Sequence, residues 1–72
     1  MATVMTEAEE MTLEGLIDSH GLSAVVDAVA RVCALKADHI DANWQDEVSA
    51  EIWRRAARTI SKTALSPHLD GL

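Results

Sequence analysis

Hydrophobic residues recur with helical spacing through the middle of the chain. Between residues 22 and 44 the apolar positions follow one another mostly at intervals of three or four, the pattern of one face of an amphipathic helix. These positions are Leu22, Val25, Val26, Val29, Cys33, Ala37, Ile40 and Trp44. No other segment is as long or as clearly periodic, so the pattern predicts a long central helix on which any core is built.

A second helical pattern covers about residues 46 to 64 and ends at Leu65-Ser66-Pro67, because the residue before a proline avoids helical geometry. At 100° per residue, its apolar face lies nearly opposite that of the central helix, so the two do not form one continuous stripe. A chain that folds back at residues 41–47 would bring both faces into one core, with Asn43 as helix cap and Asp46 as its acidic partner. The alternative is one bent helix whose halves contact different protomers. The apolar face consists of Ile52, Trp53, Ala56, Ala57, Ile60 and Ala64.

A shorter helix is predicted before the central one. It begins at about residue 7, capped by Thr6 with Glu9, or at about residue 13, capped by Thr12. It runs to Ser19, and Gly21 then suits the left-handed geometry that ends helices. The turn is short, so this helix and the central one pack as a hairpin or corner. The fold class is therefore all-α, with three helices in one domain over residues 6–65, a disordered N-terminus at 1–5 and a flexible tail at 66–72.

The central helix is apolar over more than half of its circumference, and only Asp27, Arg31, Asp38 and Asp41 form a clear polar strip. Such a helix needs more than one neighbour, and a chain of 72 residues has few helices to supply them. We therefore expect a homodimeric helical bundle. Its interface would be formed by the widened apolar sector, made of Val25, Ala28, Val29, Val32 and Leu35.

Charge is distributed unevenly along the chain. The formal net charge is −6; residues 1–51 contain 11 acidic and 2 basic side chains, whereas residues 52–72 contain 4 basic and 1 acidic. An acidic body argues against general nucleic-acid binding, because phosphate contacts need positive surface. The basic residues of the third helix nevertheless leave open an alternative, a small dimeric DNA-associated regulator. That nucleic-acid surface would be Arg54, Arg55, Arg58 and Lys62.

The compartment is expected to be the cytoplasm. The first residues lack the positive region and apolar run of a secretory signal, and no window is apolar enough for a membrane span. A single cysteine, Cys33, excludes an internal disulfide and fits a reducing environment.

The sequence offers no catalytic or metal-binding pattern. Cys33 and His39 lie six positions apart on a helix and so on different faces, and no pair of histidines has the i, i+4 spacing of a metal site. The segment from Asp41 resembles the start of a calcium loop, but it lacks the central glycine and has Ile52 where the loop needs a glutamate. No nucleophile is paired with a base, and no glycine-rich phosphate loop is present. We therefore expect a protein that is not an enzyme and has no cofactor or metal.

The two tryptophans are the only aromatic residues. Trp53, among alanines, is the better candidate for the core, and Trp44, in the predicted junction, is the better candidate for an interface anchor, a role in which tryptophan is enriched. Acidic residues near Trp44 would complete a surface that binds a protein partner. The predicted partner-binding set is Trp44, Asp38, Asp41, Asp46 and Glu47.

Three segments carry a resemblance to known proteins. With Leu16–Leu22 (LIDSHGL), Lys36–Ile40 (KADHI) and Asn43–Asp46 (NWQD), the chain resembles a group of small uncharacterised bacterial helical proteins over about residues 13–65. That group has no assigned activity, so the resemblance implies no catalytic residue. In size and acidity the chain is also similar to phage and mobile-element inhibitors, including anti-CRISPR proteins, which share no motif from which a residue could be carried over.

The expected function is that of a small acidic interaction module, possessing no catalytic activity, that occupies the surface of an unidentified protein partner and so inhibits it. The DNA-associated regulator is one alternative. An adaptor subunit of a larger complex is the other.

Overall fold

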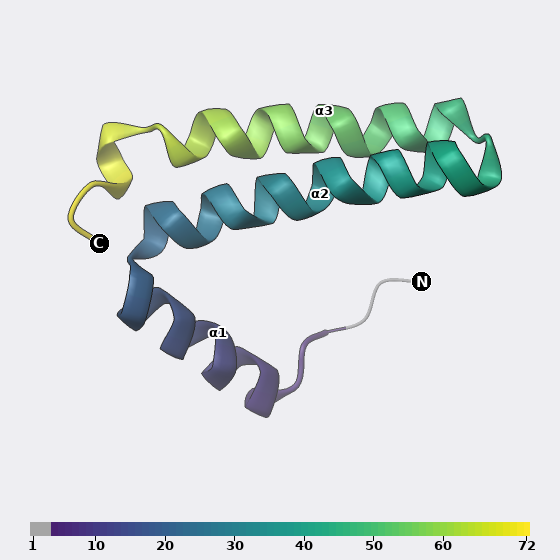
Figure 1. Cartoon of the computed structure of the whole chain (residues 1–72). Coiled ribbons are helices and arrows are strands. Elements are labelled where there is room, and N and C mark those ends of the chain that lie inside the picture. Colours follow the sequence, from purple (N-terminus) through teal and green to yellow (C-terminus); the bar gives the residue numbers. More distant parts are fainter. Residues whose placement is uncertain (1–3) are drawn as a thin grey trace.

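The computed structural model describes residues 4–72, and these residues form three α-helices and one short 3-10 helix without any strand (Figure 1). The helices are α1 (Glu7–His20), α2 (Leu22–Trp44) and α3 (Glu47–Ala64), and the 3-10 helix is η1 (Pro67–Leu69). The predicted all-α class, the three helices and the long central helix are confirmed.

Helices α2 and α3 form an antiparallel hairpin and lie side by side along their length (Figure 1). The reversal takes two residues. Gln45 adopts the left-handed conformation with a φ of 51°, and Asp46 then caps α3 by accepting hydrogen bonds from the backbone N–H of Ser49 at 3.0 Å and from its hydroxyl at 2.8 Å. The alternative of one bent helix is therefore wrong. Asn43 as the cap is also wrong, because α2 continues through it and its side-chain amide donates to the His39 carbonyl oxygen at 2.9 Å.

Small residues form the seam between α2 and α3. Among residues 4–72, six apolar residues are buried, and apart from one cysteine all are alanines: Ala30, Cys33, Ala37, Ala50, Ala57 and Ala64. Short side chains let two helices approach closely, because the distance between helix axes depends on the residues at the contact. Of the predicted main stripe of α2, Cys33 and Ala37 are buried, whereas Val29 and Trp44 are exposed. The buried face is rotated toward Ala30, since alanines there meet the alanines of α3.

Helix α1 begins at the first of its two predicted caps. The Thr6 hydroxyl accepts from the backbone N–H of Glu9 at 3.1 Å, and the Glu9 carboxylate accepts from the backbone N–H of Thr6 at 2.8 Å. Thr12 lies inside the helix, so the alternative start near residue 13 is wrong. Gly21 ends the helix with a φ of 87° and a ψ of 153°, which is outside the predicted left-handed helical region but is a positive-φ conformation that glycine adopts readily. Helix α1 then turns away from α2 at a corner (Figure 1). No side chain of α1 is buried.

The C-terminal segment returns to this corner. After η1, the carbonyl oxygen of Leu72 accepts from the backbone N–H of Leu22 at 2.7 Å, and the Ser23 hydroxyl donates to the Ala64 carbonyl oxygen at 2.7 Å. The flexibility predicted for residues 66–72 stays a prediction, but the segment has a definite fold that the sequence did not suggest. Of the predicted disordered residues 1–5, the first three lie outside the described residues, and Val4 and Met5 are exposed and not helical.

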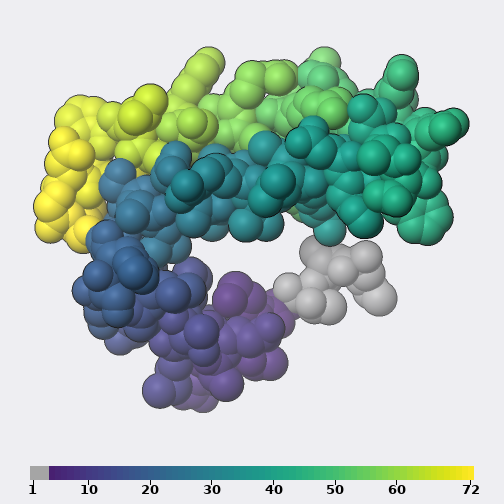
Figure 2. Space-filling view, viewed as in Figure 1, coloured from purple at the N-terminus to yellow at the C-terminus, as the bar shows by residue number. Residues whose placement is uncertain are grey.

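The three helices lie in one layer. The molecule measures 39 × 29 × 16 Å, so it is much thinner along one axis than along the other two. Its radius of gyration of 13.9 Å exceeds the value of about 11 Å expected for a compact domain of this length. In the space-filling view α1 stands away from the hairpin, with an opening between it and α2 (Figure 2). Among the described residues, no helix combines the length and the apolar character that crossing a bilayer requires.

Candidate protein-interaction surfaces

Ion pairs cover one face of the hairpin. The Arg54 guanidinium on α3 lies 3.4 Å from the carboxylates of both Asp38 and Asp41 on α2. Hydrogen bonds from Arg54, first to Asp38 and then to Asp41, raise the pKa of the arginine above its ordinary value. Arg31 pairs with Asp27 at 3.4 Å on the same row of α2. Asp38 and Asp41, predicted as partner-binding residues, thus engage an arginine of their own chain and join the two helices.

The predicted nucleic-acid strip is largely neutralised by the chain itself. Besides Arg54, Arg58 lies 2.9 Å and Arg55 3.5 Å from the Glu51 carboxylate. The hydrogen bond from Arg58 is the main reason why the pKa of Glu51 is lowered. A phosphate would have to compete with these carboxylates for three of the four predicted cations. This geometry disfavours the nucleic-acid alternative, because affinity for phosphates depends on unneutralised positive charge.

A second surface lies at the turn end of the hairpin, where three large apolar side chains are exposed. Trp44 at the end of α2 is 73% exposed, and Val48 and Ile52 on successive turns of α3 are 74% and 61% exposed. Val48 and Ile52 line a shallow hollow of about 320 Å³ together with Glu47, Glu51 and Arg55. We call Trp44, Val48 and Ile52, with Glu47 beside them, the turn surface.

Sequence reasoning identified only part of the turn surface. Trp44 and Glu47 were predicted and are exposed there. Asp46 has a local structural role, because hydrogen bonds from Ser49 hold its carboxylate at the start of α3 and lower its pKa. Val48 was missed and Ile52 was assigned to the core. Their i, i+4 spacing on the opposite side of α3 from Arg54 was the available signal.

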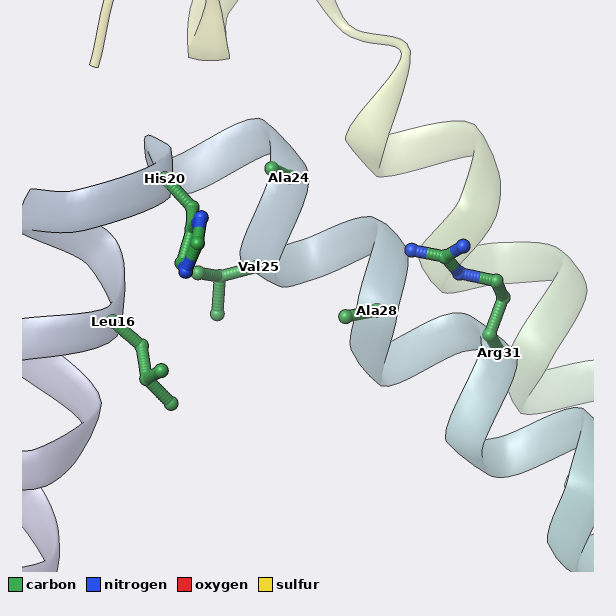
Figure 3. A pocket seen from close by; sticks show the side chains of 6 residues that line it. All are labelled: Leu16, His20, Ala24, Val25, Ala28 and Arg31. Atoms are coloured by element: carbon green, nitrogen blue, oxygen red, sulfur yellow. The ribbon is translucent and has the colours of Figure 1, made fainter.

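A third surface is the wedge between α1 and α2. It contains a hollow of about 250 Å³ lined by Leu16 and His20 of α1 and by Ala24, Val25, Ala28 and Arg31 of α2. Figure 3 shows Leu16 pointing from α1 toward the space between the helices, with Val25 and Ala28 projecting from α2 on the same side. Helix α1 therefore covers only the N-terminal part of this side of α2.

The predicted dimer residues all belong to this side of α2. Val25 and Ala28 are half-buried beside α1, whereas Val29, Val32 and Leu35 are 44%, 61% and 67% exposed. We call these five residues and Leu16 the wedge face. The structure thus brings the predicted residues together on one surface and leaves most of it uncovered within a single chain.

The remaining candidates have local roles. Trp53, predicted for the core, is only half-buried, and the Lys36 ammonium lies 5.1 Å from the centre of its ring. Cys33 is a buried free thiol in the seam between α2 and α3. Within residues 4–72, no three His, Cys, Asp or Glu side chains are grouped so as to hold a metal ion.

Searches against protein-family models, curated proteins and solved structures find no match to this chain. The resemblance carried by residues 16–22, 36–40 and 43–46 therefore stays a prediction.

Proposed function

We propose that this chain is an interaction module without catalytic activity, which occupies the surface of a partner protein through its turn surface. The observation that carries the proposal is the exposure of Trp44 at the tip of the hairpin. Tryptophan is the residue type most often found to dominate protein interfaces, where truncation of such a residue costs about 2 kcal/mol or more. An exposed tryptophan at the same end of the hairpin as an exposed valine and isoleucine is suited to fill an apolar pocket on a partner.

The charge around the turn surface suggests the kind of partner. Glu47 is exposed beside Val48, and the chain as a whole has a formal net charge of −6. An apolar pocket with a basic rim would complement this surface, because opposite potentials speed association and select partners. A basic cleft that normally binds a nucleic acid or an acidic protein has this character. Inhibition by occupation of such a cleft is the form of the function we propose.

Two other functions are distinguished from inhibition by simple observations. An adaptor subunit would stay bound to one protein in fixed stoichiometry without loss of that protein's activity. A DNA-associated regulator would bind duplex DNA at low salt and lose affinity steeply as salt rises. The pairing of Arg54, Arg55 and Arg58 with carboxylates makes the regulator the weakest of the three.

The test is affinity capture from cells that carry the gene, with the intact chain, a Trp44→Ala variant and a Leu65→Ala variant as bait. Leu65 is also an exposed large apolar residue, but it lies at the end of α3 away from the turn, so it is the matched control. We expect one stoichiometric partner to be captured by the intact chain and by the Leu65 variant. We expect the Trp44 variant to lose it, with unchanged circular dichroism, and the captured protein to be inhibited by the intact chain.

Equal capture by the Trp44 variant would show that the turn surface is not the binding site. Capture without inhibition would support the adaptor.

A further inference from the structure

The chain exposes more surface than a compact monomer of its size would. The accessible surface of the chain is 5,733 Å², whereas a compact monomer of 7.8 kDa would expose about 4,400 Å². The excess of about 1,300 Å² is larger than the roughly 800 Å² that each partner buries in an interface of standard size. One interface of standard size would therefore remove more than half of this excess.

The layer structure indicates where that interface lies. Stable domains are built from at least two packed layers, but these helices lie in one layer 16 Å thick. The charged groups on the ion-paired face of the hairpin already have partners within the chain, since Arg54 pairs with Asp38 and Asp41. The wedge face has no such pairing, and its apolar side chains lie on the side of α2 that is turned away from α3.

The uncovered part of α2 matches the length of α1. Helix α1 has 14 residues and is about 21 Å long at 1.5 Å per residue. Its own hollow on α2 ends at Arg31, and among residues 4–72 no element covers that side of residues 32–44, which is about 20 Å of helix. At the helical period, Val32, Leu35, His39 and Ala42 form one row along this segment, and all four are exposed.

The charges of α1 and of the border of the wedge face have opposite signs. Helix α1 contains five acidic residues and no lysine or arginine: Glu7, Glu9, Glu10, Glu14 and Asp18. Arg31 and Lys36 border the wedge face on α2, and no acidic residue lies among its apolar side chains. Within the chain Arg31 also pairs with Asp27, and the Lys36 ammonium also lies over the Trp53 ring. An acidic helix is therefore complementary to the border of this face.

From these observations we propose that a second copy of the chain fills the wedge, with α1 of each copy packed along residues 32–42 of the other copy's α2. The pairing is reciprocal about a two-fold axis, so one arrangement covers both wedge faces at once. The two α1 helices and the two α2 helices become a central four-helix bundle, with the α3 helices outside. The turn surface at the far end of each hairpin is separate from this interface.

The test measures absolute mass by light scattering across a dilution series, together with circular dichroism. The intact chain is compared with the double variant Val32→Glu, Leu35→Glu and with the control double variant Val48→Glu, Ile52→Glu. Both variants replace two exposed apolar residues by glutamate, the first on the wedge face and the second on the turn surface. We expect twice the 7.8 kDa mass for the intact chain and the control. The wedge variant should be at least about 100-fold weaker in self-association, because each glutamate would be buried against an acidic helix.

A wedge variant that loses helix as it loses the dimer also supports the proposal, because neither side chain has a buried contact to lose within one chain. A folded monomer for the intact chain at high micromolar concentration would overturn it. A wedge variant that dimerises as tightly as the intact chain would overturn it as well. The capture experiment with the Trp44 variant tests the turn surface and not the wedge face. The proposed partner binding and the proposed dimer can therefore fail independently of each other.

Discussion

Gln45 is the residue that reverses the chain between α2 and α3. Its φ of 51° places a side chain other than glycine in the left-handed region, which costs about 1–2 kcal/mol. The conformation is retained because it lets α2 end by a hydrogen bond from the Gln45 N–H to the Asp41 carbonyl oxygen at 3.2 Å. It also places Asp46 where it can cap α3.

Replacing Gln45 by glycine should stabilise the protein. The change removes the left-handed strain and loses no buried contact, since Gln45 is exposed. Part of the gain is offset by the greater freedom of glycine in the unfolded chain, so the free energy of unfolding should rise by about 0.5–1 kcal/mol. Urea unfolding at matched protein concentration measures it. Gln45→Ala is the control and should change little, and equal stability of the two variants would contradict the explanation.

Asp46 should make the stability of the hairpin depend on acid pH. Hydrogen bonds from Ser49 lower its pKa in the folded chain, so its contribution is present in full above the ordinary aspartate value. That contribution is lost as pH falls below about 4 and through the lower folded pKa. Asp46→Asn keeps an oxygen for the Ser49 N–H but cannot titrate. Between pH 7 and pH 2.5 the thermal unfolding midpoint should therefore fall further for the intact chain than for the variant. Midpoints that fall in parallel with pH would count against this role of Asp46.

At the scale of elements, α2 uses two faces for two different purposes. Its alanine and cysteine face packs against α3, and its valine and leucine face belongs to the wedge. The periodicity of α2 was readable from the sequence. The partner of each face could not be read from the sequence. A pattern of apolar positions does not show that the small apolar side chains pack against α3 while the large ones stay exposed.

Enlarging the seam should destabilise the hairpin. Ala37 is completely buried between α2 and α3, so Ala37→Leu would force the helices apart and lower the free energy of unfolding by about 1–3 kcal/mol. Ala34→Leu is the matched control on the same helix, where an exposed position borders an open hollow of about 270 Å³. It should change stability by less than about 0.5 kcal/mol. Denaturant unfolding at equal protein concentration compares them, and similar losses for both would mean that the seam is not closely packed.

At the scale of the whole molecule, the flat shape links stability to concentration. The buried side chains are small, and no large side chain among the described residues is completely buried. A core of small side chains contributes little to the free energy of unfolding, because the free energy of burial follows the apolar area removed from water. A second copy on the wedge face would supply the missing burial.

The thermal unfolding midpoint should therefore rise with protein concentration, as mass action requires of a folded dimer in equilibrium with unfolded monomers. Circular dichroism melts from about 1 to 100 µM would show a shift of several degrees for the intact chain. The Val32→Glu, Leu35→Glu variant should show none. A midpoint independent of concentration for the intact chain would mean that the single layer is stable by itself.

The local structure of this protein follows from short stretches of its sequence. The apolar period set the helices, Thr6 with Glu9 set the start of α1, Gly21 set its end, and Pro67 limited α3. These signals act within a few residues, so they can be read without knowledge of the fold. The predicted anchor Trp44 was also found exposed, because a junction between helices offers a large side chain little cover.

The roles of the helix faces, in contrast, depend on how the helices pack against one another. It assigned alanines to the seam, paired Asp38 and Asp41 with Arg54, and left Val32 and Leu35 uncovered. Each of these results depends on which residue lies opposite which across two helices. That alignment follows from the left-handed turn at Gln45 and the corner at Gly21, and the spacing of residues within one helix does not contain it.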